Sequence, residues 1–154
     1  MHLEDFMDRN LVFIIDKPKN KLSFLEILAA RVGSVIPGID VISMLSRLEE
    51  REAEVSTGIG NGVAIPHTTV KGLKEPVCVI AKTPGGVDFE SLDGSPVFIS
   101  FLLLSPPHST GTHLRLLARI ARLVMNDTFI SSIIDAVDVK EIYDITARED
   151  LQHV

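Results

Sequence analysis

Three closely spaced glycines precede a histidine in residues 56–67, which read STGIGNGVAIPH. Glycine adopts backbone angles that are closed to other residues, so a loop of this kind can turn its N–H groups toward an anion. The imidazole of His67 can act as a nucleophile when a ring nitrogen is unprotonated. The pattern therefore favours an anionic group held covalently on His67, with backbone donors around its oxygens. The residues expected to form this anion-binding loop are Thr57, Gly58, Gly60, Asn61 and Gly62.

Other kinds of site fit this segment less well. A dinucleotide-binding fingerprint has its third glycine one residue later and a helix after it, and the chain contains no Gly-Lys-Ser/Thr of a P-loop. His67, His108 and His113 could together bind a metal, but there is no HExxH motif and no cysteine pair, and His108 lies in a segment typical of an ordinary loop. Since a histidine after a strand is most often structural, the glycines carry the argument for a reactive His67. No metal and no cofactor are expected.

The composition is that of a globular protein. The 154 residues are 45% hydrophobic and 23% charged, and the formal net charge of −6 opposes loose binding to nucleic acid or anionic lipid. No apolar run approaches the roughly 18 residues of a membrane span and no leader peptide is recognisable, so we expect a cytoplasmic protein without direct membrane insertion. Cys78, the single cysteine, lies in an apolar run typical of a buried, unreactive thiol. The length suits one domain over residues 1–154.

Apolar runs predict the strands that must position the loop and the histidine. Buried strands are expected at residues 11–15, 63–65, 77–81 and 97–104. Pro66 has no N–H for a ladder, so the strand before it should end there and His67 should emerge at its edge. A loop is expected at residues 84–86 and a hairpin turn at Asp93-Gly94, and Pro96 should precede the last strand.

Apolar periodicity and capping residues predict the helices. Asn20 can cap a first helix that stops near Gly33, with Leu22, Leu25, Leu28 or Ala29, and Val32 inward. Asp40 can cap a second helix with Val41, Leu45 and Leu48 inward, which ends in the charged run of residues 49–52. Most of that run is typical of a solvated face.

The clearest helical period follows the polar loop of residues 108–112. It places His113 in the first turn and one apolar face on Leu114, Leu117, Ala118, Ala121 and Val124. Asp127 can cap a short helix, and Asp138 with Glu141 can form a capping box for a last helix reaching about Arg148. Strands separated by helices, together with a hairpin, predict an α/β protein: a three-layer α/β/α sandwich with a mixed central sheet of about four to five strands.

Several of these segments together resemble one known family. Arg51 followed by residues 56–67 closely resembles the active-site signature of the fructose/mannitol-type (type 2) enzyme IIA of the bacterial phosphoenolpyruvate-dependent phosphotransferase system. That class includes the nitrogen-regulatory IIA proteins. The resemblance continues through GVDF at 86–89, DGSPV at 93–97, FLLL at 101–104 and HLRLLA at 113–118, so it covers nearly the whole chain.

The resemblance implies a phosphocarrier that needs no cofactor. His67 would accept a phosphoryl group from the histidine phosphocarrier protein, His113 matches the second active-site histidine, and Arg51 lies at the spacing of the active-site arginine. The guanidinium fork of Arg51 suits phosphoryl oxygens. A histidine in the first turn of a helix lies near the positive end of the helix dipole, so the ring of His113 should stay neutral and donate one hydrogen bond.

Two destinations of the phosphoryl group remain open. A nitrogen-regulatory IIA would be read by target proteins in its phosphorylated and unphosphorylated states, whereas a sugar-transport IIA would hand the group to a IIB domain. The sequence contains no fused IIB or phosphocarrier domain, which favours the regulatory type.

Overall fold

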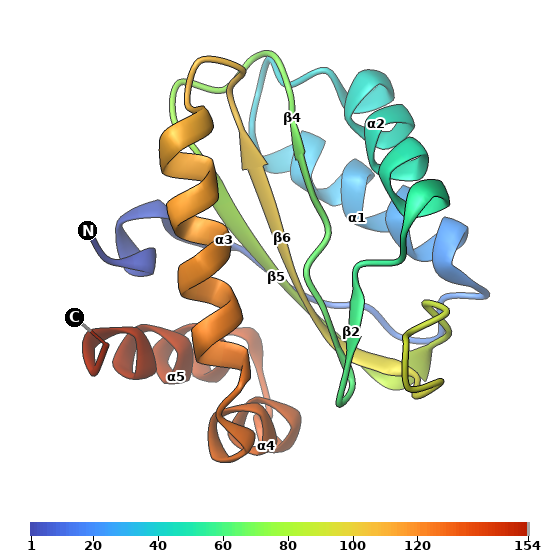
Figure 1. Ribbon diagram of the computed structural model, residues 1–154, viewed down its shortest axis with the longest axis vertical. Coiled ribbons are helices and arrows are strands. Elements are labelled where there is room, and N and C mark those ends of the chain that lie inside the picture. The colour runs from blue at the N-terminus through green and yellow to red at the C-terminus, as the bar shows by residue number, and fades with distance from the viewer. Residues whose placement is uncertain (154) are drawn as a thin grey trace.

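Helices cover both faces of a mixed β-sheet in the computed structural model, which describes residues 1–153 (Figure 1). The strands are β1 Met7–Ile14, β2 Gly58–Gly60, β3 Val63–Ala64, β4 His67–Thr69, β5 Val77–Val87 and β6 Val97–Ser105. The helices are the short 3-10 helix η1 Leu3–Phe6, then α1 Lys21–Val35, α2 Val41–Glu54, α3 Thr110–Val124, α4 Asp127–Asp135 and α5 Val139–Leu151. The predicted α/β class is confirmed.

The sheet has the order β1-β5-β6-β3-β2, and β4 also pairs with β6. The β5–β6 and β2–β3 pairs are antiparallel, whereas β1–β5, β3–β6 and β4–β6 are parallel, as a mixed sheet requires. Within residues 1–153, the sheet has five strands along this path and the short β4 beside it, and β3 and β4 follow one another along the same edge of β6.

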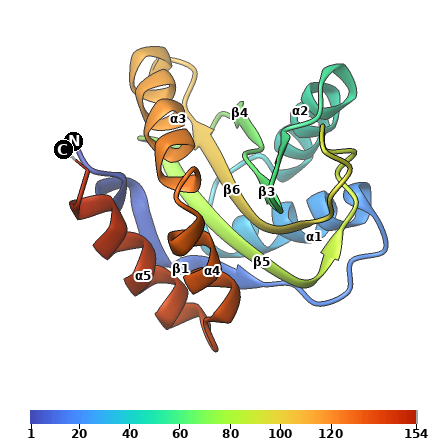
Figure 2. The same cartoon turned by 60° about the horizontal axis from the view of Figure 1, so that its bottom comes forward.

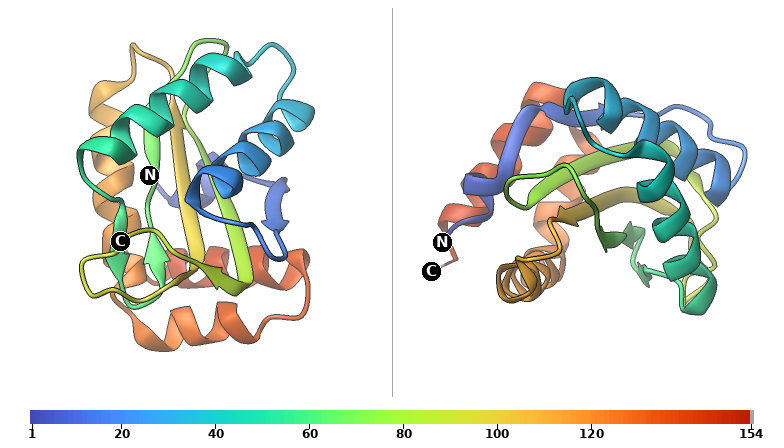
Figure 3. Two further views of the ribbon diagram at one scale, coloured as in Figure 1. Left: turned by 90° about the vertical axis from the view of Figure 1, so that its right-hand side faces the viewer. Right: turned by 90° about the horizontal axis from the view of Figure 1, so that it is seen from above.

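Two hydrophobic cores fill the spaces between the three layers. Figures 2 and 3 show α1 and α2 on one side of the sheet and α3, α4 and α5 on the other. Side chains alternate along a strand, so Leu102 and Leu104 of β6 join the first core while Phe101 and Leu103 join the second. The main helical contributors are Phe24, Leu28, Met44 and Leu48 to the first core and Leu116, Ile120, Ile133 and Ile142 to the second. The three-layer prediction is therefore confirmed.

Three predicted helix caps are present. The side chain of Asn20 accepts from Ser23 N at 2.8 Å at the start of α1. Asp40 accepts from Ser43 N at 3.0 Å at the start of α2, and Asp138 accepts from Glu141 N at 2.9 Å at the start of α5. Each satisfies a backbone donor that lacks a partner within its helix.

Three details of the predicted helices are wrong. Helix α1 ends at Val35, two residues beyond Gly33, and the glycine instead permits close approach of α2: a Cβ there would lie 2.3 Å from Cγ2 of Val41. Leu22, expected on the inner face of α1, is 47% exposed. Helix α4 is capped by Asn126 rather than Asp127, since the Asn126 side chain accepts from the backbone N–H groups of Thr128 and Phe129.

The predicted inner face of α3 is also wrong in part, although Val124 is buried as expected. The buried residues are His113, Leu116, Arg119, Ile120, Leu123 and Val124, whereas Leu114 is 61% exposed. Arg119 belongs to the buried face because its Nε donates to Asp150 Oδ1 of α5 at 2.6 Å and its Nη2 donates to the carbonyl oxygens of Asp150 and His153. A buried ion pair thus interrupted the apolar pattern. The corrected face turns His113 toward the sheet.

One strand extends beyond its predicted end, and the ladder of another resumes after a break. Residues 84–86 are not a loop, since β5 continues through them with a register shift between Lys82 and Val87. The ladder after β3 is not ended by Pro66 either: Pro66 O accepts from Leu103 N at 2.9 Å, and β4 resumes in unchanged register, with Val63 opposite Ile99 and His67 opposite Leu103. His67 therefore lies at the start of a paired strand rather than beyond the ladder.

The remaining sequence expectations concern the hairpin, the cysteine and membrane spans. Strands β5 and β6 form the expected hairpin, with Gly94 N donating to Ser91 O at 2.9 Å in its turn. Cys78 is buried, and burial together with the charge of Asp150 raises the pKa of its thiol to about 12, so it stays in the unreactive thiol form. Among residues 1–153, no helix combines the length and the apolar character needed to cross a bilayer.

Candidate active site

Two of the predicted site residues, His67 and His113, lie side by side. Their ring centroids are 5.8 Å apart and the ring planes are inclined by 55°. His67 begins β4, and His113 lies in the first turn of α3, which follows β6 after the connection of residues 106–109. Figure 1 shows both elements at the upper end of the molecule, where β4 and the start of α3 flank the end of β6. The topology thus brings together two histidines that are far apart in the sequence.

One hydrogen bond assigns the proton on the ring of His67. Nδ1 lies 2.8 Å from the backbone oxygen of Ile65, which can only accept. Nδ1 therefore carries the proton, and Nε2 holds the lone pair in the neutral ring. The ring is half-buried, and Nε2 is the ring nitrogen of His67 that has a lone pair available.

His113 is buried beneath the surface of the site, and its surroundings favour the neutral ring. Its Nδ1 lies 2.6 Å from the hydroxyl oxygen of Ser105. Burial, and secondarily the charge of His67, lower the pKa of His113 below its usual value. The predicted neutral ring agrees with this direction, although burial rather than the helix terminus is the leading cause.

Helix α2 lies beside β4 and runs in the opposite direction. Arg47 Nη1 donates to the hydroxyl of Thr69, the last residue of β4, at 3.5 Å. Farther along α2, the Glu52 side chain binds Thr57, whose carbonyl oxygen accepts from Ile65 N at 3.0 Å. From its start to its end, α2 therefore passes from the last residue of β4 toward the residues that precede β4 in the sequence.

If ideal spacings hold from the Arg47–Thr69 bond onward, Arg51 is expected at about the level of His67. Arg51 is one turn beyond Arg47 on the same face of α2, a rise of about 6 Å, which nearly matches the ~6.6 Å that separates two residues along a strand. Its Nη1 donates to Val55 O at 3.0 Å. A guanidinium has five N–H donors, so this bond leaves others for a bound anion.

The glycine segment forms a β-hairpin, and its turn does not lie beside His67. Asn61 and Gly62 take positive φ angles of 56° and 80° at the turn between β2 and β3. Gly62 O accepts from Phe98 N at 2.8 Å, near the start of β6, whereas His67 pairs with Leu103 near its end. The five residues from Gly62 to His67 span about 16 Å along a strand.

Three of the expected loop donors are bound to protein acceptors. Thr57 N donates to Glu52 Oε2, Gly58 N to Ser56 Oγ and Asn61 N to Asp93 Oδ2, each at 3.0 Å. These three N–H groups are therefore bonded within the protein, two of them to carboxylates, and none is directed at a free anion in this structure. For Gly60, which also has a positive φ, and for Gly62, a part in anion binding stays a prediction.

The hairpin is anchored by Glu52, a residue that was expected on a solvated face. Its carboxylate is buried, accepts from Thr57 N and from the Thr57 hydroxyl, and pairs with Lys21 Nζ at 2.6 Å. The spacing of Met44, Leu48 and Glu52 at intervals of four residues could have placed Glu52 on the inner face of α2. Glu52 thus joins α1, α2 and the start of the hairpin.

Replacing Glu52 with alanine should lower the free energy of unfolding by about 3 kcal/mol, because the change leaves buried partners of the carboxylate unpaired. Urea denaturation measures the effect. Glu49→Ala is the matched control on the same helix, since Glu49 is exposed, and it should change the stability by no more than about 0.5 kcal/mol. Equal stability of the two variants would contradict the anchoring role.

Asp93 fastens the turn of the hairpin to the loop of residues 88–96. Its carboxylate accepts from Asn61 N at 3.0 Å and from the backbone and hydroxyl of Ser95 at 3.0 and 2.7 Å. These bonds, led by the one from Asn61, lower the pKa of Asp93 to about 2.

We expect the carboxyl carbon of Asp93 to titrate by NMR with a midpoint near pH 2 rather than 3.8. Because the folded pKa is depressed, the contribution of these bonds to stability is complete above the unfolded pKa and is lost as the pH falls toward 2. Ser95→Ala removes one hydroxyl donor and should raise the midpoint. A midpoint at the ordinary value would show that the three bonds do not persist in solution.

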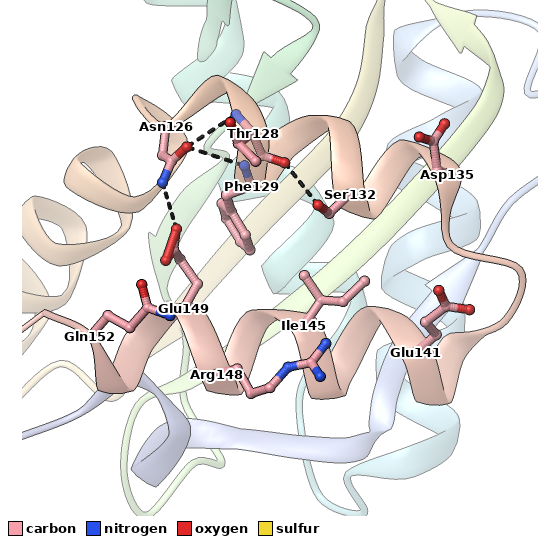
Figure 4. A pocket seen from close by; sticks show the side chains of 10 residues that line it. All are labelled: Asn126, Thr128, Phe129, Ser132, Asp135, Glu141, Ile145, Arg148, Glu149 and Gln152. Atoms are coloured by element: carbon pink, nitrogen blue, oxygen red, sulfur yellow. Dashed lines mark hydrogen bonds between the residues drawn. The ribbon is translucent and has the colours of Figure 1, made fainter.

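Among residues 1–153, neither a metal-binding cluster nor a groove between α4 and α5 coincides with the histidine pair. Within the part of the chain that the structure describes, no group of three or more His, Cys, Asp or Glu side chains is placed to hold a metal ion. A groove of about 570 Å³ lies between α4 and α5 (Figure 4), with Phe129 and Ile145 among its lining residues. Its lining comes from residues 126–152 and includes none of the predicted site residues.

Comparison with known proteins identifies the class of protein that this fold and histidine pair define. Residues 5–148 match the family model of the phosphoenolpyruvate-dependent sugar phosphotransferase system, EIIA 2. The chain therefore belongs to this family, as the resemblance of its motifs indicated.

Relatives of both functional types are found. The chain is 38% identical over 116 residues to a nitrogen regulatory protein of Pseudomonas aeruginosa, covering 75% of this chain and 74% of the relative. It is 29% identical over 141 residues to the fructose-specific EIIA component of Haloferax volcanii, covering 90% of each. The crystal structure of the nitrogen regulatory protein IIA-Ntr from Neisseria meningitidis superposes with a TM-score of 0.83 at 26% identity, covering 94% of this chain and 98% of that one.

Proposed function

We propose that this protein is a phosphocarrier that accepts a phosphoryl group on Nε2 of His67 from the histidine phosphocarrier protein. The observation that carries the proposal is the bond from His67 Nδ1 to Ile65 O, which leaves the lone pair on Nε2, next to a neutral His113. The Nε2–P bond forms as the P–N bond to the donor histidine breaks, and that bonding pair returns to the donor ring. Nε2 carries no proton, so no general base is needed.

Arg51 and His113 have distinct parts in this transfer. The guanidinium N–H groups of Arg51 that are not bound to Val55 O would bind phosphoryl oxygens by charge-assisted bonds. His113 would donate a single hydrogen bond to the same group, and its neutral ring adds no like charge beside His67. Both interactions grow in strength as charge shifts during in-line transfer. Neither residue is required to carry the phosphoryl group.

The test is incubation of the protein with labelled phosphoenolpyruvate, enzyme I and the histidine phosphocarrier protein. An acid-labile, base-stable phosphate should appear on the protein, as expected of phosphohistidine. Omitting the phosphocarrier protein is the control and should prevent labelling. Failure of the folded protein to accept phosphate from the complete system would overturn the proposed function.

We infer further that the protein is a cytoplasmic regulator of the nitrogen-regulatory type. The Pseudomonas aeruginosa relative and the Neisseria meningitidis structure support this assignment. Phosphorylation adds up to two negative charges beside Arg51 and His113, so a target protein can distinguish the two states by charge alone. The second candidate function is sugar transport, with a IIB domain as the acceptor. The similarity to the Haloferax volcanii component supports this alternative.

A pull-down from native cytosol distinguishes these two functions. The baits are the wild-type protein in both phosphorylation states and His67→Ala. A regulator should retain a non-transport protein with affinities that differ at least about tenfold between the states, which is about 1.4 kcal/mol. Recovery of a IIB protein alone, with phosphate passing on to a sugar, would instead establish the transport function.

A further inference from the structure

Ser105 ends β6 beside His113, and its side chain is fully buried. The alternation of side chains along β6 places it on the same face as Phe101 and Leu103, toward α3. Its hydroxyl oxygen lies 2.6 Å from Nδ1 of His113. The mechanism above uses His113 but assigns no part to this serine.

The surroundings of the hydroxyl decide which group donates. Among residues 1–153, His113 Nδ1 is the hydrogen-bond partner found for Ser105 Oγ. If Nδ1–H donated to Oγ, the buried hydroxyl proton would lack an acceptor, at a cost of about 1–3 kcal/mol. If the hydroxyl donates to Nδ1, this cost is avoided. The second arrangement therefore has the lower free energy.

The direction of this bond determines the tautomer of His113. A neutral imidazole has one N–H, so a ring that accepts at Nδ1 must carry its proton on Nε2. The lowered pKa of His113 keeps the ring in this neutral form. The pair then presents complementary groups: an unprotonated Nε2 on His67 and an Nε2–H donor on His113.

We propose that Ser105 is a positioning residue that holds His113 as the Nε2–H tautomer and orients this donor toward a phosphoryl group on His67. The assignment rests on the proposed function. In the sequence, Ser105 precedes Pro106 and looks like an ordinary strand end. Its role toward His113 becomes visible only in the folded structure.

The same strand supplies a matched control. Ser100 of β6 is also fully buried, but its hydroxyl has no hydrogen-bond partner within residues 1–153. Ser100→Ala and Ser105→Ala thus remove the same atom from the same strand, and only the second breaks a bond to His113. Ser105→Thr restores the hydroxyl and serves as the rescue variant.

The first measurement is the ¹⁵N spectrum of the His113 ring in the unphosphorylated protein, which does not depend on the proposed function. In the wild type, Nδ1 should have the shift of an unprotonated acceptor and Nε2 that of a protonated nitrogen. Ser105→Ala should shift the Nδ1 signal, whereas Ser100→Ala should leave it in place and Ser105→Thr should restore it. A protonated Nδ1 in the wild type would overturn the proposal.

The second measurement is the rate at which phosphorylated protein returns its phosphoryl group to the histidine phosphocarrier protein. Ser105→Ala should slow transfer roughly 3- to 10-fold, less than loss of a direct donor to the reacting group. Ser100→Ala should transfer at the wild-type rate. Equal rates for the two variants would overturn the role in transfer. Lack of phosphorylation in the wild type would reject the proposed function, while the ¹⁵N result would still test the Ser105–His113 bond.

Discussion

Replacing His67 with alanine should abolish labelling by phosphoenolpyruvate, enzyme I and the histidine phosphocarrier protein. The hydrogen bond from His67 Nδ1 to Ile65 O leaves one unprotonated ring nitrogen at the surface of the site, and the substitution removes it. His113 cannot replace it when its Nδ1 is bound to Ser105 and its Nε2 is protonated. Labelling is measured as acid-labile phosphate on the intact protein, with circular dichroism to verify folding.

His108 provides the control for this experiment. It is exposed in the loop between β6 and α3, close in sequence to His113, and no hydrogen bond or ion pair of its side chain is found within residues 1–153. His108→Ala should therefore accept phosphate at the wild-type level. Labelling of folded His67→Ala to the same extent as His108→Ala would show that another residue is phosphorylated.

Much of the fold could be predicted because its determinants are local. Asn20, Asp40 and Asp138 each cap a helix with their own side chains, and the apolar run of residues 97–104 belongs to a strand covered on both faces. Such features depend on residues near in the sequence. The inner face of α3 could not be predicted in the same way, because the partner of Arg119 is Asp150, 31 residues later.

The histidine pair could be predicted from the family motif, but the arrangement around it could not. Glu52 was assigned to a charged face, since its buried partners Lys21 and Thr57 become neighbours only when α1, α2 and the hairpin pack together. The Ser105–His113 bond likewise joins the end of a strand to a helix. Interactions of this kind follow from the tertiary structure, and composition or periodicity does not show them.

Two glycines of the segment, Gly58 and Gly60, permit close packing that the sequence did not predict. A Cβ on Gly58 would lie 2.3 Å from Ser91 Oγ and 3.1 Å from Phe89 Cβ. A Cβ on Gly60 would lie 3.0 Å from Asp93 Oδ2, the oxygen that accepts from Asn61 N. The glycines thus allow the loop of residues 88–96 to lie against the hairpin, which supports the edge of the sheet that continues into β4 and His67.

Replacing His113 with alanine should leave labelling of His67 intact but slow onward transfer by roughly 10- to 10³-fold, the range typical of losing one oriented donor. The reason is that His113 stabilises the transferring group without bonding to phosphorus. Rapid-quench measurement of the loss of phosphate to an acceptor protein determines the rate. Complete loss of phosphate acceptance by a folded His113→Ala would reverse the roles of the two histidines.

Two amide variants determine which ring nitrogen of His113 matters. The side-chain nitrogen of glutamine reaches about as far as Nε2 of histidine, whereas that of asparagine reaches about as far as Nδ1. Because Nδ1 of His113 faces Ser105, only a donor at the position of Nε2 can serve the phosphoryl group. His113→Gln should therefore recover part of the rate that His113→Ala loses, and His113→Asn should not. If asparagine restored transfer and glutamine did not, the donor would be Nδ1, and the bond to Ser105 could not exist in the reacting state.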